Sequence, residues 1–258
     1  MPRLPDWLIY LGVVLVLSAA SFGRREQVNA PAPPPPVPGA DQAPISPASP
    51  FAEATLVHIG GGRANRGTAF AVADRVWLTA ASAVAGCGKP AIVVADGWAA
   101  PAKVLGRAGD VAVLGAEDGA PALGFAKSGR PAPSARGFVA GFSRGTPGEA
   151  ATIYLGNIRS RLAWAEIGRT DGLKGPLFGF AGAPMLDASG VVAGMVIGDA
   201  PRRGLVTAAT PAELTAALAT AGRKAGGADA PQPITRDNYG RAADVLRRAT
   251  SVVAVDCL

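Results

Sequence analysis

Short runs of β-forming residues dominate the chain from Ala54 onward and limit what it can fold into. These runs are rich in Val, Ile, Leu and Thr, and clusters of Gly, Asp and Pro separate them. They form two series, one before and one after a proline-bearing connector at residues 120–134. Each series predicts about six strands, which is typical of two β-barrels or of a β-sandwich. Because long helical patterns do not alternate with the strands, a parallel α/β sheet is excluded.

The composition supports a β-rich fold and argues against a nucleic-acid partner. Glycine accounts for 34 of the 258 residues, which suits many turns between short strands. The net charge is +6, but the arginines are scattered and form no basic stripe interleaved with aromatic residues. We therefore interpret the charge as a basic, solvated surface. One histidine and two cysteines make no zinc set, so we expect neither a metal nor a cofactor.

The N-terminal segment, residues 1–26, predicts a route out of the cytoplasm. An uncharged run, Trp7–Phe22, is flanked by arginines on both sides and is close to the length of a membrane span. It predicts a transmembrane anchor, and the small residues Ser18 and Ala20 leave a cleaved signal peptide as the alternative. Residues 27–50 are rich in Pro and Ala and predict an extended linker. We expect an inner-membrane anchor with the domain in the periplasm, or secretion if the segment is cleaved.

Helical signals come late in the chain. Thr210 followed by Pro211 and Glu213 is typical of a helix start, and Gly222 marks the end of that helix. A second helical pattern within residues 234–250 places four residues on one face: Tyr239, Ala242, Ala243 and Leu246. Residues 251–258 predict a strand. We interpret residues 223–258 as a helix and strand docked on the barrels, not as a separate domain.

The two cysteines, Cys87 and Cys257, are a suggestive number for an exported chain. A disulfide between them would tie the extreme C-terminus to the early part of the domain. Two free thiols at unrelated places are the alternative.

Three segments resemble trypsin-like serine proteases. GTAFAVADRVWLTAASAV at 67–84 is similar to the strands that end in Thr-Ala-Ala-His, and GDVAVL at 109–114 resembles the strand that carries the aspartate. GFAGAPMLDASGVVAGMV at 179–196 is similar to the nucleophile loop and the hairpin after it. The order and spacing match the family, and the HtrA-type bacterial envelope proteases are the most similar branch, without a PDZ domain here. The resemblance implies an all-β fold of two six-stranded antiparallel barrels within residues 51–222.

The resemblance also locates the catalytic triad and implies that it is degenerate. Ser82 stands at the histidine position, Asp110 at the aspartate position and Ala181 at the nucleophile position. A methyl group cannot attack a carbonyl, and a serine hydroxyl cannot act as a general base near neutral pH. The N–H groups of Gly179 and Ala181 would form the oxyanion hole. We therefore expect no functional catalytic residues.

Other residues are weak substitutes for the missing groups. His58 is the chain's one histidine and is predicted to be half-buried in the first strand. Ser128 and Ser143 are predicted in loops near the substrate groove, and Lys174 precedes the nucleophile loop. A Ser–Lys pair is disfavoured because no serine occupies the nucleophile position.

These observations lead to three hypotheses about function. The first is an inactive protease homologue that binds a peptide or protein partner in the cell envelope. The second is an active serine-type endopeptidase that uses a non-standard base or nucleophile. The third is a purely structural envelope module.

Overall fold

The computed structural model describes residues 51–52, 55–60, 65–95, 97–125, 136–143, 146–154, 162–165, 180–199, 205–227, 233–235 and 237–258. Contacts divide the chain into two units, Met1–Pro44 and Ile45–Leu258, and all described residues belong to the second. The predicted membrane segment and linker lie outside the described residues. Among the helices that are described, none is long and apolar enough to cross a membrane.

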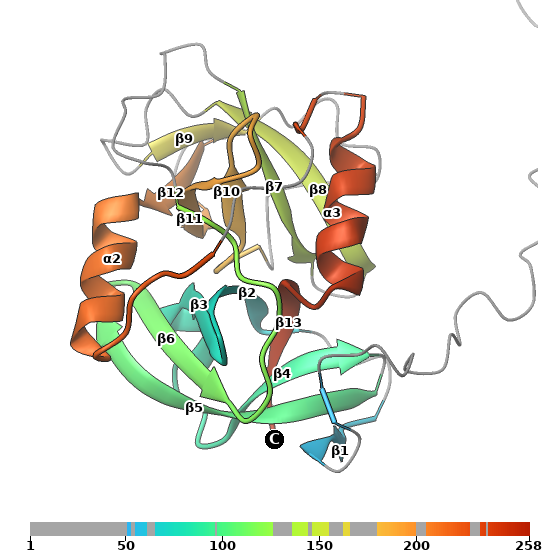
Figure 1. Ribbon diagram of the computed structural model, residues 1–258, viewed down its shortest axis with the longest axis vertical. Helices are drawn as coiled ribbons and strands as arrows, with labels where there is room; N and C mark the ends of the chain where they lie inside the picture. Colours follow the sequence, from blue (N-terminus) through green and yellow to red (C-terminus); the bar gives the residue numbers. More distant parts are fainter. Residues whose placement is uncertain are drawn as a thin grey trace, which may run out of the picture. The chain divides into compact units, whose positions relative to one another are not determined.

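A seven-stranded antiparallel sheet forms one half of the described domain (Figure 1). Its strand order is β1-β5-β4-β13-β2-β3-β6, and β5 pairs with β6 in addition to β4. The strands are β1 (Val57–His58), β2 (Gly67–Ala73), β3 (Val76–Ala80), β4 (Pro90–Ala95), β5 (Trp98–Ala108), β6 (Val111–Ala116) and β13 (Val252–Cys257).

A closed barrel forms the other half, with the strand order β10-β11-β12-β9-β8-β7. Pairing of β10 with β7 closes it, with Met185 opposite Val139. The strands are β7 (Arg136–Ser143), β8 (Thr146–Tyr154), β9 (Leu162–Ala165), β10 (Pro184–Leu186), β11 (Val192–Asp199) and β12 (Leu205–Ala209). The predicted β fold with a closed six-stranded barrel is therefore confirmed.

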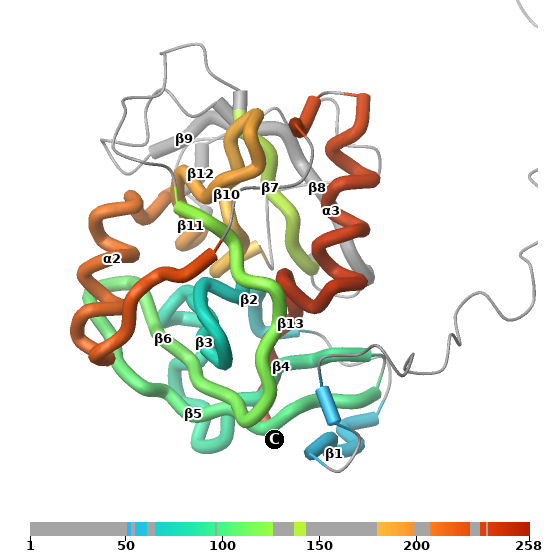
Figure 2. Tube along the Cα trace, viewed as in Figure 1, coloured from blue at the N-terminus to red at the C-terminus, as the bar shows by residue number. Residues whose placement is uncertain are grey.

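The C-terminal strand is an integral part of the first sheet. The sequence predicted only a strand docked on the barrels, and β13 lies between β2 and β4 (Figure 1, Figure 2). Its two faces bury apolar side chains in different clusters, Val252 on one side and Val253 and Val255 on the other. A strand that is apolar on both faces is stabilised in an interior position, because an outer position would leave one face in water. The first series of runs therefore supplies only part of the first sheet.

Two helices and a short 3-10 helix complete the described structure. Helix α2 (Pro211–Thr220) begins with the predicted capping box: Thr210 Oγ1 accepts from the Glu213 N–H at 3.3 Å, and Glu213 Oε2 accepts from the Thr210 N–H at 2.7 Å. Helix α3 (Tyr239–Arg248) turns its predicted apolar face to the core, with Ala243 buried. The 3-10 helix η2 (Ala81–Val84) follows β3 directly.

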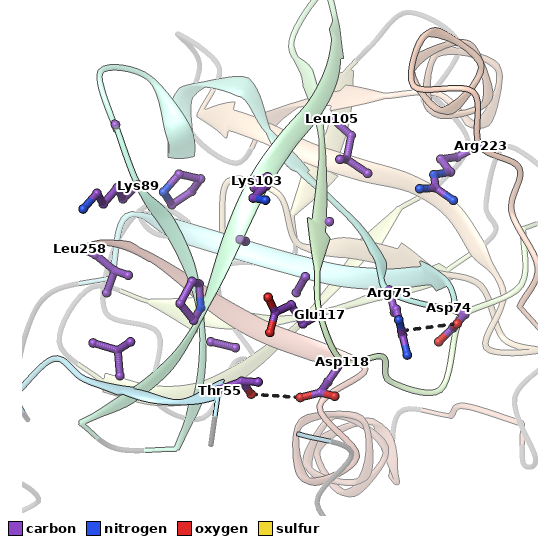
Figure 3. A pocket seen from close by; sticks show the side chains of 18 residues that line it. Thr55, Asp74, Arg75, Lys89, Lys103, Leu105, Glu117, Asp118, Arg223 and Leu258 are labelled. Atoms are coloured by element: carbon purple, nitrogen blue, oxygen red, sulfur yellow. Dashed lines mark hydrogen bonds and ion pairs between the residues drawn. The ribbon is translucent and has the colours of Figure 1, made fainter. Parts of the chain in front are cut away.

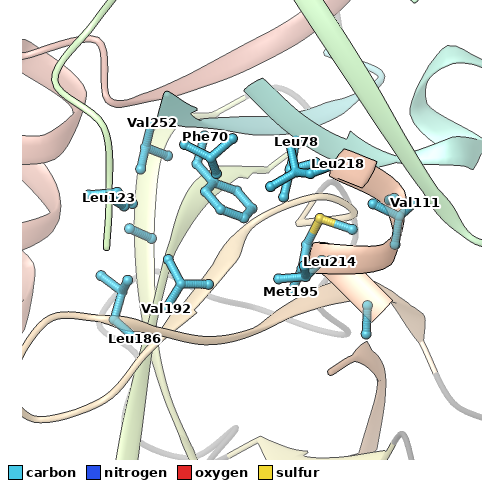
Figure 4. Close-up of a cluster of buried hydrophobic side chains, with 14 of the residues drawn as sticks. Phe70, Leu78, Val111, Leu123, Leu186, Val192, Met195, Leu214, Leu218 and Val252 are labelled. Carbon is cyan, nitrogen blue, oxygen red and sulfur yellow. The ribbon is translucent and has the colours of Figure 1, made fainter. Parts of the chain in front are cut away.

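A continuous hydrophobic core joins the two halves of the domain (Figure 4). Phe70 and Leu78 of the first sheet, Met195 of the barrel and Leu214 of α2 are all 0% exposed and belong to the same cluster. A second cluster within the first sheet surrounds Trp77 and includes Phe51. Shared burial of this kind makes the two halves one folding unit.

The capping box of α2 provides a test of local stability. Thr210→Ala removes the acceptor for the Glu213 N–H, so the free energy of unfolding should fall by about 1 kcal/mol. The matched control is Thr215→Ala, which removes an exposed hydroxyl in mid-helix and should change stability by less than about 0.5 kcal/mol. Urea denaturation of the full chain measures both. Equal effects of the two substitutions would contradict the capping role.

Candidate functional site

A tight turn at residues 180–183 shapes the loop predicted to carry the nucleophile position. The Ala183 N–H donates to the Phe180 carbonyl at 2.7 Å, and the Gly182 N–H donates to the Val196 carbonyl on β11 at 2.7 Å. Gly182 has a φ of +91°, a backbone conformation that favours glycine. A Cβ at Gly182 would lie 2.0 Å from the Thr68 carbonyl oxygen, so a side chain cannot fit there. The turn therefore has one specific shape, held by backbone contacts.

This loop is attached to the start of β2. The Thr68 N–H donates to the Ala181 carbonyl at 2.8 Å. A Cβ at Gly67 would lie 2.6 Å from the Ala181 carbonyl oxygen and 2.7 Å from the Ala83 Cβ. Because Gly67 has no side chain, the loop and η2 both approach β2 closely. This close approach brings Ala181 near the helix that carries Ser82.

The aspartate position lies beside the same helix. The Ala81 N–H, at the start of η2, donates to the backbone carbonyl of Asp110 at 2.8 Å. Ser82 and Asp110 are exposed, and Ala181 is half-buried. The fold thus gathers the three segments that carry Ser82, Asp110 and Ala181 into one accessible region. Gly179, the other predicted oxyanion-hole residue, lies outside the described residues, as do Ser128 and Lys174.

The side chains at two of the three predicted triad positions differ from those of a serine-protease triad. Position 181 offers a methyl group, and position 82 offers a hydroxyl in place of an imidazole. The chain's one histidine, His58, lies in β1 at the sheet edge, and its ring contacts that of Trp98 at 5.1 Å between centroids. The prediction that His58 is half-buried is wrong, because β1 is only two residues long and both are exposed. Ser143, predicted in a loop, is the last residue of β7.

Two arginines hold the C-terminal end of η2. Arg66 donates through Nε to the Ala83 carbonyl at 2.9 Å and through Nη2 to the Ala85 carbonyl at 2.5 Å. Arg107 donates through Nη2 to the Val84 carbonyl at 3.4 Å. Three successive carbonyls at the end of this short helix thus accept hydrogen bonds from guanidinium groups. Cations are stabilised at a helix C-terminus because its free carbonyl oxygens carry partial negative charge. The sequence showed these residues only as scattered surface arginines, because contacts to backbone carbonyls leave no residue pattern.

The predicted disulfide forms just beyond η2. Cys87 and Cys257 are bonded, with their Cα atoms 5.7 Å apart and a sequence separation of 170. The Cys87 N–H also donates to the Val84 carbonyl at 3.3 Å. The disulfide therefore links the end of β13 to the segment that follows Ser82, and the alternative of two free thiols is excluded.

A separate groove lies on the first sheet (Figure 3). It has a volume of about 1320 Å³, and none of the three triad positions lines it. Lys89, Lys103 and Arg223 line it together with Glu117, so its charges are mixed. Asp118 also lines it and accepts from the Ala52 N–H at 3.0 Å. Within the described part of the chain, no cluster of three or more His, Cys, Asp or Glu is arranged to hold a metal ion.

The sequence profile of the trypsin-like peptidase domain family matches residues 67–195, which is half of the chain (129 of 258 residues). The chain belongs to this family. The matched span includes Ser82, Asp110 and Ala181. No curated protein sequence matches the chain.

Several solved protease structures are similar to the chain, each at low sequence identity and with a TM-score below 0.5. The inactive form of Rv3671c from Mycobacterium tuberculosis H37Rv, a serine-to-alanine mutant, is 24% identical, covers 78% of this chain and 97% of its own, and has a TM-score of 0.45. The HtrA-type protease AlgW with a decapeptide is 19% identical over 60% of this chain and 51% of its own, with a TM-score of 0.47. A serine endoprotease from Yersinia pestis is 17% identical over 59% of this chain and 56% of its own, with a TM-score of 0.47. This chain thus spans about half the length of the last two proteins.

The shape of the 180–183 turn depends on Gly182, which gives a second test. Gly182→Ala forces a Cβ against the Thr68 carbonyl and a strained φ on alanine. We expect the free energy of unfolding to fall by roughly 2–5 kcal/mol. Gly198→Ala on β11 is the matched control, since a Cβ there meets nothing within 4 Å. Chemical denaturation of both variants measures the difference, and a loss at Gly182 no larger than at Gly198 would contradict the close approach.

Proposed function

We propose that this chain is a proteolytically inactive member of the trypsin-like peptidase family that binds an extended segment of a peptide or protein partner. The observation that carries the proposal is Ala181, a methyl group at the predicted nucleophile position inside a loop whose shape is fixed by backbone hydrogen bonds. Ser82, at the position of the general base, removes the second reactive group. The backbone hydrogen bonds around positions 82 and 181 fix the shape of this region, which supports a role in binding.

The loss of turnover expected when two triad groups are missing supports a binding function over proteolysis. Removing one main member of a triad already lowers turnover by about 10⁶-fold, and removing a second member adds little because the residues act as a unit. Oxyanion-hole and binding contacts alone leave only about 10³- to 10⁴-fold over the reaction in water. No second base compensates within the described residues near Ser82, since His58 is at the sheet edge. We therefore assign the loop to recognition.

The main-chain N–H groups of the loop support a peptide as the ligand. The N–H groups of Gly182 and Ala183 are used inside the fold, whereas within the described part of the chain no backbone carbonyl accepts the Ala181 N–H. This N–H is suited to donating to a carbonyl of a bound peptide. A ligand held through its backbone carbonyls is an extended peptide.

The proposal places the domain in the cell envelope, attached to the inner membrane through residues 1–26. The Cys87–Cys257 disulfide supports an oxidising compartment such as the periplasm. The apolar run Trp7–Phe22 supports the anchor, and cleavage after it would give a secreted form.

A fluorophosphonate probe tests the absence of a nucleophile. The full chain should remain unlabelled, because Ala181 has no oxygen to attack the phosphorus centre. The double variant Ser82→His with Ala181→Ser supplies both the imidazole base and the hydroxyl nucleophile. Its labelling rate should exceed that of the parent by about 10²-fold or more.

Each single variant serves as a control, since Ala181→Ser alone lacks the base and Ser82→His alone lacks the nucleophile. Labelling of the unmodified chain that disappears on substituting one serine would overturn the inactive assignment and favour an unusual active peptidase.

Binding is tested separately on an array of random-sequence peptides. Ala181→Trp places a large ring at the half-buried loop position, and we expect the signal from bound peptides to fall by about tenfold or more. The matched control is Ala188→Trp, at an exposed turn position between β10 and β11, which should leave binding unchanged. No binding by the parent chain, or equal loss in both variants, would contradict a peptide site at Ala181 and favour a structural module.

A further inference from the structure

Strand β13 occupies an interior position of the first sheet, where α3 precedes it and the Cys87–Cys257 disulfide holds its C-terminal end. β13 pairs with β2 through Val253 opposite Ala69, and with β4 through Asp256 opposite Ala91. All residues from Val252 to Asp256 are buried. Departure of β13 would expose the hydrogen-bonding edges of β2 and β4 and an apolar slot between them.

The connection from α3 to β13 is short and strained. Three residues, Ala249 to Ser251, separate the end of the helix from the start of the strand. Thr250 has a φ of +55° and is 5% exposed. This left-handed conformation is unfavourable for a β-branched residue, so the folded-back connection stores strain that an extended connection releases. Short strained hinges favour exchange of the element that they attach.

We propose that β13 is an exchangeable strand that a second copy of this chain can supply, which gives a reciprocal dimer. Each slot is refilled by an identical strand, so every contact of β13 with β2 and β4 is restored and only the hinge differs between the two forms. The strand from one copy then places its Cys257 beside Cys87 of the other copy. The covalent bond that closes the monomer would thereby join the two chains of the dimer.

The cysteine pair makes the exchange directly measurable. Two full-length variants, Cys87→Ser and Cys257→Ser, are unfolded, mixed and refolded in mild detergent with oxidised glutathione. Neither variant can form the bond within one chain, whereas exchange places the remaining Cys257 of one variant beside the remaining Cys87 of the other. The two thiols lose two electrons and two protons to form the bond, and oxidised glutathione is reduced to two thiols in return.

The readout is a denaturing gel without reductant, with a mass tag on one variant. We expect mixed covalent dimers about tenfold more abundant than the dimers of either variant with itself, because only the mixed pair aligns two cysteines by strand pairing. Mixed dimers at the random statistical proportion, or none, would overturn the proposal.

The hinge supplies a matched pair of variants at one position. Glycine adopts a positive φ without strain, so Thr250→Gly should lower the dimer fraction of the full chain. Proline cannot adopt a positive φ and also disfavours the helical conformation of the preceding residue, Ala249, so Thr250→Pro destabilises the folded-back connection. We expect the Pro variant to give about tenfold or more dimer than the Gly variant at equal concentration. Equal dimer fractions would contradict the role of the hinge. None of these measurements depends on peptide binding, so they stand or fall independently of the proposed function.

Discussion

The insertion of β13 between β2 and β4 is the constraint on which the rest of the described domain depends. It completes the first sheet, supplies Val252 to the core shared with the barrel, and brings Cys257 to Cys87. Val255 of β13 also lies opposite Gly67, the residue whose missing side chain allows the loop at Ala181 to approach β2. Because all these contacts involve β13, this strand helps to hold in place the candidate site around Ala181.

At the candidate site, backbone contacts determine the shape of the loop and of the neighbouring 3-10 helix. Gly182, Gly67 and the hydrogen bond from Thr68 to Ala181 shape the loop through the backbone, and the arginines at the end of η2 do the same for the segment that carries Ser82. None of these contacts requires a histidine at position 82 or a serine at position 181. The shape of this region therefore does not depend on which side chains stand at the two positions.

Much of the fold was accessible from local sequence patterns. Strand β2 begins at Gly67, the first residue of the segment 67–84 predicted to contain strands, and the cap at Thr210 and the buried face of α3 agree with prediction as well. These features depend on residues a few positions apart, which is the range over which periodicity and capping act. The exposure of His58 and the contacts of Arg66 were not accessible, because an edge position and a bond to a distant carbonyl depend on the partners that folding provides.

The sequence by itself determined which groups stand at the three positions predicted for the triad, where most strands run, and that the chain belongs among trypsin-like folds. Only the tertiary structure decided that the last strand is an interior one, that Cys87 meets Cys257 across 170 residues, and that Gly67 lies against Ala181. The reason is physical. Strand and helix signals come from neighbours along the chain, whereas these three outcomes come from burial and pairing between segments that only the folded core brings together.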